Sequence, residues 1–228
     1  MTNLVFKQNP NRYLLPPVKK DYYQKLYNYI RKQKKNINGV IDIGCATGNF
    51  LFSMPYDIRA IGIDKNSELI KYAKKSRVKK NLSFYNIDIF NFVKIKKLNT
   101  NGCIITLLGT ISTIPDFKKL FRKILQLKPH SILINDWLNI FDVDIRCGFR
   151  SADETNYNFG FNILSIKTFK SILTAYNVEF KIEPYSMATT LKRGKDPLCS
   201  WHANLDGEKI ITNGTGLVLR GYNIYIKT

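Results

Sequence analysis

Short apolar runs alternate along this chain with longer stretches in which apolar residues recur at helical spacing. Because a wholly apolar run of four to eight residues is typical of a strand buried on both faces, the runs predict parallel strands. The predicted strands are 40–43, 61–64, 82–87, 103–108 and 131–135. The predicted helices are 18–35, 49–53, 67–76, 115–127 and 165–175, with Ser67 as the N-cap of the third. Alternating strands and helices favour an α/β fold, a doubly wound sheet with helices on both faces.

Two more strands, 179–182 and 217–226, complete this pattern, and two stretches fall outside it. The stretches 138–162 and 186–216 show no clear periodicity. Insertions at the carboxyl edge of a sheet shape ligand pockets, so we expect both to lie beside a binding site. The domain prediction is an N-terminal lid segment and helix at 1–36, followed by one domain at 37–228 that carries both insertions.

The turn after the first predicted strand is the most informative part of the sequence. VIDIGCATGNF, residues 40–50, places small residues at positions 44, 46 and 48, where a backbone can come close to a bound molecule. The next strand ends in Asp64, where a carboxylate can accept both hydroxyls of a ribose. A ligand that contains a nucleoside is therefore predicted.

The spacing of this turn separates two kinds of nucleoside cofactor. A dinucleotide requires G-x-G-x-x-G, whereas position 46 is Ala and the third glycine position is Asn49. Asp42 lies inside the strand, where a carboxylate would repel a pyrophosphate. The same carboxylate suits the positive sulfonium and ammonium groups of S-adenosylmethionine (SAM). We therefore expect SAM as the cofactor and S-adenosylhomocysteine (SAH) as its product.

These residues resemble the first signature of the class I, Rossmann-like SAM-dependent methyltransferases, acidic-x-Gly-x-Gly/Ala-x-Gly, of the small bacterial type. The resemblance covers about 40–185 and the final strand. It implies a seven-stranded, mostly parallel sheet that ends in an antiparallel C-terminal hairpin, which the terminal YNIYIK suits. The cofactor-binding residues that we expect are Asp42, Gly44, Cys45, Ala46, Gly48, Asn49, Phe50, Asp64, Lys65, Asp88, Ile89, Leu108 and Gly109.

Two members of this set have alternative roles. The resemblance implies that Asp88 accepts the adenine amino group and that Ile89 packs on the ring, while capping of the following helix is the alternative for Asp88. Leu108 and Gly109 end the fourth strand, and ligands bind outside the carboxyl ends of parallel strands. We expect them to line the methionine arm of the cofactor, a tight strand-to-helix turn being the alternative.

Methyl transfer needs an aligned acceptor and, for a neutral hydroxyl, a base. His202 and Asp136 are the candidate catalytic residues, with a hydrogen-bonded structural role as the alternative for His202. The candidate substrate-binding residues are Tyr13, Trp137, Arg146, Arg150, Tyr157 and Trp201. Because guanidinium groups suit anions, the arginines favour an anionic or sugar-like acceptor, and a surface ion-pair network is the alternative.

Charge adds a second hypothesis. The chain has 36 Lys and Arg against 17 Asp and Glu, a net charge of +19, which favours a polyanion such as RNA. The excess is mostly Lys and accompanies many Asn, Ile and Tyr, as a low-GC coding bias produces. The four cysteines form no C-x-x-C pair, so neither a zinc site nor a disulfide framework is predicted, and no metal is expected. With no membrane-length apolar run and no apolar stretch in the first 13 residues, we expect a cytoplasmic location.

Missing motifs narrow the predicted reaction. The chain lacks the Asp/Asn-Pro-Pro-Tyr motif of amino-group methylation, and 197–199 matches the nucleophile of cytosine C5 enzymes poorly. We predict metal-independent methylation of a small molecule at oxygen. The insertions are loosely similar to bacterial enzymes that tailor surface polysaccharides, which implies a carbohydrate or a nucleotide-linked or phosphorylated precursor. The alternatives are an RNA methyltransferase and a non-catalytic methyltransferase-like binding subunit.

Overall fold

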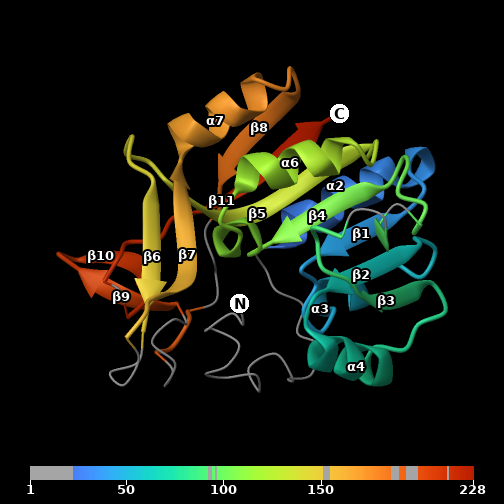
Figure 1. The fold of residues 1–228 in the computed structure, drawn as a ribbon, viewed down its shortest axis with the longest axis horizontal. Helices are drawn as coiled ribbons and strands as arrows, with labels where there is room; N and C mark the ends of the chain where they lie inside the picture. The colour runs from blue at the N-terminus through green and yellow to red at the C-terminus, as the bar shows by residue number, and fades with distance from the viewer. Residues whose placement is uncertain are drawn as a thin grey trace.

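Seven strands of the nine-stranded main sheet lie side by side in the order β3-β2-β1-β4-β5-β11-β8 (Figure 1). The computed structural model describes residues 23–91, 94–95, 97–150, 155–185, 190–193, 200–214 and 216–228. The strands of this sheet are β1 Val40–Ile43, β2 Ala60–Asp64, β3 Leu82–Asn86, β4 Ile104–Leu108, β5 Ser131–Asn139, β8 Glu179–Pro184 and β11 Gly221–Lys227. β1 to β5 pair in parallel, whereas β11 runs antiparallel to both β5 and β8. The predicted doubly wound sheet with its antiparallel C-terminal hairpin is confirmed.

Helices cover both faces of the sheet because successive strand residues point to opposite sides. The helices are α2 Gln24–Gln33, α3 Asn49–Phe52, α4 Ser67–Ser76, α6 Phe117–Leu125 and α7 Ile166–Thr174. Val40 belongs to the apolar cluster that contains residues of α2, α3 and α4, and its neighbour Ile41 belongs to the cluster of α6 and α7. The strands of the parallel part are therefore buried on both faces, as their continuous apolar runs predict.

Several boundaries differ from the prediction. β5 continues four residues beyond position 135 because β11 pairs with it as far as Trp137 and β7 pairs with Leu138 and Asn139. The N-cap of α4 is Asn66, not Ser67, because the Asn66 side chain accepts hydrogen bonds from the backbone nitrogens of Glu68 and Leu69.

The two insertions, which have no clear periodicity in the sequence, contain β-hairpins. β6 Ile145–Phe149 pairs with β7 Asn158–Ser165, and β9 Trp201–Leu205 pairs with β10 Glu208–Thr212. A third apolar cluster joins them, since Phe161 and Ile163 of β7 pack with Ile211 of β10 and with Trp137 of β5. The hairpins therefore lie together on the β5 side of the molecule (Figure 1).

The predicted N-terminal lid falls mostly outside the described residues, which begin at Tyr23, within 1–36. Within the described ranges, no helix combines the length and the apolar character that crossing a bilayer requires.

Candidate cofactor site

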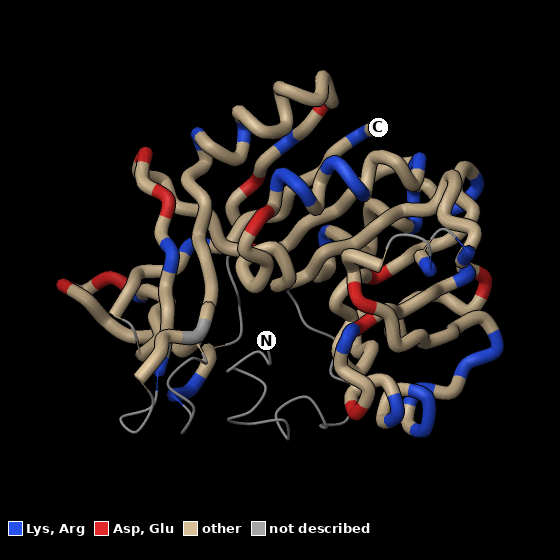
Figure 2. Tube along the Cα trace, in the orientation of Figure 1, with Lys and Arg blue, Asp and Glu red and all other residues tan. Residues whose placement is uncertain are grey.

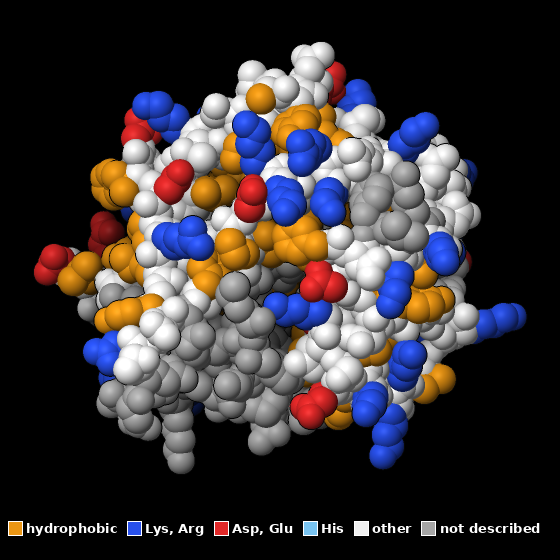
Figure 3. All heavy atoms as spheres, viewed as in Figure 1, with side chains coloured by type: hydrophobic (Ala, Val, Ile, Leu, Met, Phe, Trp, Pro, Cys, Tyr) orange, Lys and Arg blue, Asp and Glu red, His pale blue; other side chains and the backbone are white. Residues whose placement is uncertain are grey.

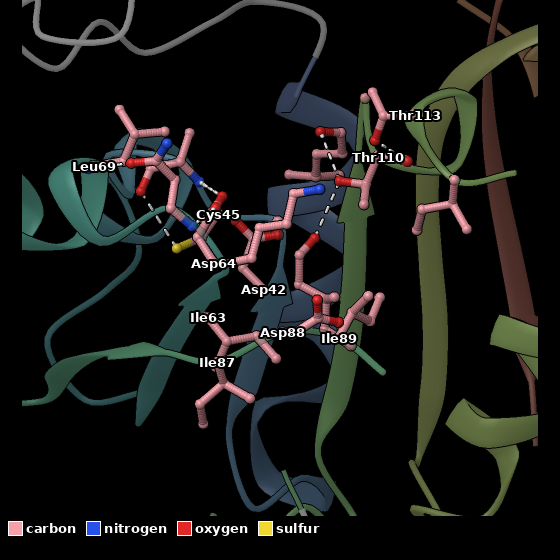
Figure 4. A pocket seen from close by; sticks show the side chains of 18 of the residues that line it. Asp42, Cys45, Ile63, Asp64, Leu69, Ile87, Asp88, Ile89, Thr110 and Thr113 are labelled. Carbon is pink, nitrogen blue, oxygen red and sulfur yellow. Dashed lines mark hydrogen bonds between the residues drawn. The ribbon is translucent and has the colours of Figure 1, made fainter. Parts of the chain in front are cut away.

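A cleft of about 750 Å³ opens at the carboxyl ends of β1, β2, β3 and β4 (Figure 4). Its volume lies within the range of small-molecule sites. The lining includes the predicted cofactor residues with one exception: Asp42, Gly44, Cys45, Ala46, Asn49, Phe50, Asp64, Lys65, Asp88, Ile89, Leu108 and Gly109. The exception is Gly48, which packs against the ring of Phe84 below the turn. The cleft also takes in residues that the sequence did not single out, among them Tyr23, Leu69, Thr113 and Pro115.

The glycine turn has a backbone shape that explains its small residues. Gly44 and Gly48 have φ values of 75° and 74°, in the left-handed region that favours glycine. A Cβ on Gly48 would lie 2.3 Å from the Phe84 ring, and one on Gly44 would lie 2.7 Å from Thr110 Oγ1. The turn is held to β2 because the Gly44 and Cys45 nitrogens both donate to the carbonyl of Ile63.

Asp64 links this turn to the next helix. Its Oδ2 accepts from Ala46 N and its Oδ1 from Asn66 N, both at 2.9 Å. Burial raises the pKa of Asp64, while these two backbone donors act in the opposite direction. The carboxylate is thus fixed at the end of β2 and on the wall of the cleft, where the ribose is expected.

Asp42 is a buried carboxylate on the floor of the cleft. Thr106 Oγ1 donates to its Oδ1 at 2.6 Å. Burial raises the pKa of Asp42 to about 7, the Thr106 hydrogen bond opposes this rise, and the charge of Asp64 adds to it. A buried carboxylate that is costly to ionise is one that a cationic ligand would stabilise.

Asp88 follows β3 at the edge of the cleft, and its predicted adenine contact stays a prediction. Its Oδ1 accepts from Phe90 N at 2.7 Å, so the side chain fixes the turn that follows β3. The side chain is nonetheless exposed and lies on the cleft wall with Ile89.

These residues fit SAM. Within the described lining, three carboxylates, Asp42, Asp64 and Asp88, outnumber the two lysines, Lys65 and Lys94, which favours a cationic ligand over a pyrophosphate. A side chain at Gly44 would clash with Thr110, so glycine keeps the backbone itself on the cleft wall. The structure does not test the prediction that no metal is bound. In the described part of the chain, no group of three metal-ligating side chains occurs.

Asp136, a candidate base, is buried behind the cleft. Its Oδ2 accepts from Ser112 N at 3.1 Å and its Oδ1 from Trp137 N at 2.9 Å. Burial raises the pKa of Asp136 to about 6, against the effect of these donors. Ser112 belongs to the 3-10 helix η4 Ile111–Thr113, whose last residue lines the cleft. In this geometry Asp136 anchors the cleft wall.

His202 lies on β9 and forms a pair of hydrogen bonds with Leu191. Leu191 N donates to His202 Nδ1 at 2.8 Å, and His202 N donates to Leu191 O. Because Nδ1 accepts, the neutral ring carries its proton on Nε2, which can then only donate. Burial and the charge of Lys209 lower the pKa of His202. This arrangement favours the structural alternative for His202.

The predicted substrate-binding residues are not among the described residues that line the cleft, and Tyr13 lies outside the described ranges. Trp137 packs in the third apolar cluster. The others form cation–ring pairs on the described residues of 145–165 and 190–212, which we call the hairpin body. The pairs are Arg146 over Phe159, Arg150 over Tyr157 and Arg193 over Trp201. Sequence reasoning missed Phe159 and Arg193, because strand pairing that brings distant positions together was not visible in these insertions.

Known proteins were compared with the chain. A family model described as Methyltransferase domain matches residues 34–159. A curated relative, "Putative methyltransferase 235L" of Invertebrate iridescent virus 6, is 47% identical over 55 residues. That match covers 23% of this chain and only 20% of the relative, so the chain spans about a fifth of that protein's length.

Solved structures show the same fold at low identity. The YcgJ protein of Bacillus subtilis has a TM-score of 0.57 and 14% identity, with 89% of this chain and 97% of that one covered. The plantazolicin methyltransferase BpumL, solved with SAH, has a TM-score of 0.56 and 16% identity, covering 98% and 87%. The family model matches more than half of this chain, so the chain belongs to the methyltransferase domain family. Its fold is that of the class I SAM-dependent enzymes.

Proposed function

We propose that this methyltransferase transfers the methyl group of SAM to an oxygen of a small-molecule acceptor, a carbohydrate or a nucleotide-linked or phosphorylated precursor. The observation that supports SAM as the cofactor is the acidic cleft built around the glycine turn, with Asp42 and Asp64 in its lining. The use of such an acceptor in bacterial surface polysaccharide tailoring remains a prediction from the loose similarity of the insertions.

The hairpin body supports a separate acceptor region. Asn162 of β7 donates through Nδ2 to the carbonyl of Ile111, and Asp136 holds the neighbouring Ser112 N, so β5 and β7 both fix η4. The same η4 contributes Thr113 to the cleft. An acceptor bound at the hairpins would therefore lie next to the wall from which the methyl group is presented.

The hairpin body offers cations to an anionic acceptor. Arg146 and Arg193 are exposed, and their guanidinium groups lie 5.2 Å and 5.1 Å from the ring centroids of Phe159 and Trp201. Stacking holds the planar fork in one orientation while its N–H groups stay available. This arrangement supports the binding of a phosphate or carboxylate by these arginines over their alternative role in a surface ion-pair network.

The protein's part in the reaction is binding and orientation, and the proton of a hydroxyl acceptor passes to solvent because Asp136 and His202 are held in structural hydrogen bonds. When bound, SAM supplies a methyl group that its sulfonium already activates. Asp64 would hold the ribose, Asp88 and Ile89 the adenine, and Asp42 would offset the positive charge of the cofactor. η4 and the Gly109 turn fix the wall along which the acceptor oxygen must align.

The test is SAH formation with a panel of acceptors. Purified protein and SAM are incubated with nucleotide-linked sugars, phosphorylated sugars and neutral sugars, and with structured and unstructured RNA. We expect turnover with a phosphorylated or nucleotide-linked sugar and loss of that turnover in Arg146→Gln. Lys167→Gln, which removes an exposed ion pair with Asp142, is the matched control and should keep full turnover.

Two outcomes would count against the proposal. Turnover with RNA alone would move the protein to the RNA hypothesis. SAM binding without turnover on any member of the panel would contradict the proposed acceptor class, and turnover that is unchanged in Arg146→Gln would remove Arg146 from the acceptor site.

A further inference from the structure

Arg77 is a buried arginine behind the cofactor cleft. It is only 3% exposed and lies at the C-terminal end of α4. Its guanidinium carbon lies 5.7 Å from the ring centroid of Phe52 and 5.4 Å from that of Tyr72, so rings from α3 and α4 enclose it. Burying a cation is costly, so a buried guanidinium usually has partners for its charge or its N–H donors.

The guanidinium contacts the cofactor cleft through Asn49. Arg77 Nη2 donates to Asn49 Oδ1 at 2.9 Å, and Asn49 is the first residue of α3 and lines the cleft. A guanidinium carries only donors, so the amide atom that faces it must be the oxygen. The Asn49 NH₂ group, with two donors, is therefore turned away from Arg77.

Two carboxylates of the cleft are complementary to other parts of the cofactor. Asp64 accepts, as ribose hydroxyls require, and Asp88 accepts, as an adenine amino group requires. A donor suits an acceptor group, and the α-carboxylate is the one anionic acceptor that SAM and SAH carry. The Arg77 charge behind the amide carbonyl polarises the amide and favours an anion in front of it.

We propose that Arg77 is a positioning residue that fixes the Asn49 amide so that its NH₂ group binds the α-carboxylate of the cofactor. This inference rests on SAM as the cofactor and on the expected places of ribose and adenine, and it does not depend on the identity of the acceptor.

The test compares two ligands that differ in the amino-acid arm. Binding of SAH and of 5′-methylthioadenosine, which lacks that arm, is measured by calorimetry for the wild type, Asn49→Asp, Arg77→Met and Lys75→Gln. Asn49→Asp keeps an oxygen for Arg77 but replaces the donor with an anion. We expect it to weaken SAH binding at least tenfold, to leave 5′-methylthioadenosine binding within twofold, and to keep the wild-type melting temperature.

Arg77→Met should weaken SAH binding selectively in the same way, with a lower melting temperature because packing between α3 and α4 is lost. Lys75 is exposed on the same helix, so Lys75→Gln removes one positive charge without touching Asn49 and should change neither affinity. If Arg77→Met does not fold, Asn49→Asp carries the test.

Equal losses for both ligands would overturn the carboxylate assignment, because both share only the adenosine part and the sulfur. Unchanged SAH affinity in Asn49→Asp would show that the amide does not contact the cofactor. A wild-type protein that binds neither ligand would contradict the cofactor itself, which is a different failure and is recognised without any variant.

Discussion

Ionisation of buried Asp42 destabilises the folded protein, and a bound cationic cofactor should offset this. Its pKa is about 7 in the folded protein against an ordinary value of 3.8, so the folded state holds the proton more tightly than the unfolded state. Stability from this group is therefore fully present below about pH 4 and is lost as pH rises to about 7. The difference between the two values corresponds to about 4 kcal/mol as an upper limit.

Asp42→Asn should separate stability from cofactor binding. The amide still accepts the Thr106 hydroxyl but cannot ionise, so we expect the ligand-free variant to melt higher than the wild type at pH 8 and at the same temperature near pH 4. Thermal unfolding at both pH values measures this. Part of the wild-type loss of stability with rising pH would persist in the variant. Asp136 has a pKa of about 6, also raised by burial, and therefore contributes a loss in the same direction. A variant less stable than wild type at pH 8 would contradict the prediction.

The same carboxylate predicts the pH dependence of cofactor affinity. Because a cationic ligand favours ionised Asp42, SAM affinity in the wild type should rise several-fold between pH 6 and pH 8. In Asp42→Asn the affinity should be lower and nearly flat over this range. Calorimetry at four pH values tests it, and an equal slope in the two proteins would exclude Asp42 as the titrating group.

Substitution of Asp64 should affect both stability and cofactor binding, because its carboxylate accepts backbone hydrogen bonds and lines the cleft. Asp64→Ala removes a charged acceptor from the cleft and should weaken SAM binding by roughly 10 to 100-fold. It also leaves Ala46 N and Asn66 N without this partner, so a lower melting temperature is expected. Asn66→Ala, which removes the α4 cap, is the control for the structural part and should lower stability by about 1 kcal/mol.

At the scale of elements, the glycine turn is the most constrained segment. Gly48 has a φ of 74°, and an added Cβ would lie 2.3 Å from the Phe84 ring, so Gly48→Ala should destabilise the protein by about 2 to 4 kcal/mol. Gly207, in the β9–β10 turn, also has a positive φ but no atom within 4 Å of such a Cβ. Gly207→Ala therefore measures only the strain of a positive φ in alanine. Urea unfolding of both variants gives two losses in the free energy of unfolding, and their difference is the contribution of the clash with Phe84. Equal losses would mean that Phe84 moves aside freely.

The parallel sheet and its cofactor edge could be predicted from sequence because both depend on local patterns. Apolar runs such as 40–43 mark strands that are buried on both faces. Asp42 lies inside the first strand, Gly44 directly follows it, and Asp64 ends the second. The hairpins could not be predicted, since β6 pairs with β7 across a register shift at Cys147 and Gly148 and both have exposed positions. Asp136 looks like a base in sequence, and only its contact with Ser112 shows the anchoring role.

At the scale of the whole molecule, basic residues dominate the surface without converging on the cleft. Figure 2 shows Lys and Arg along α4 and α6, and Figure 3 shows them spread over the visible face with acidic groups between them. The described cleft lining itself has more carboxylates than lysines. The positive field is therefore expected to attract any polyanion, with little selectivity.

This distribution distinguishes a compositional charge from an RNA-binding face. Lys119 of α6 lies 5.8 Å from the ring centroid of Phe90, which lines the cleft, whereas Lys74 and Lys75 lie exposed on α4. A true RNA site would use the first turn of α6, because it follows Pro115 in the cleft lining, whereas Lys74 and Lys75 lie in the last turn of α4, at the other end of that helix from Leu69, which lines the cleft. The double variants Lys118→Glu with Lys119→Glu, and Lys74→Glu with Lys75→Glu, make the same change in net charge on the two helices.

We expect both double variants to weaken RNA binding equally, and RNA affinity to fall at least ~10-fold between 50 and 200 mM salt, because counterion release alone drives such binding. SAH affinity should stay within about twofold in both, since the partly buried carboxylates of the cleft are screened little by salt or by distant charge. Filter binding for RNA and calorimetry for SAH give the two numbers. A selective loss of RNA affinity in the α6 variant, accompanied by RNA-dependent SAH binding, would instead place the acceptor at the first turn of α6. A charge that arises from composition alone has no reason to favour the lysines that lie nearer the cleft.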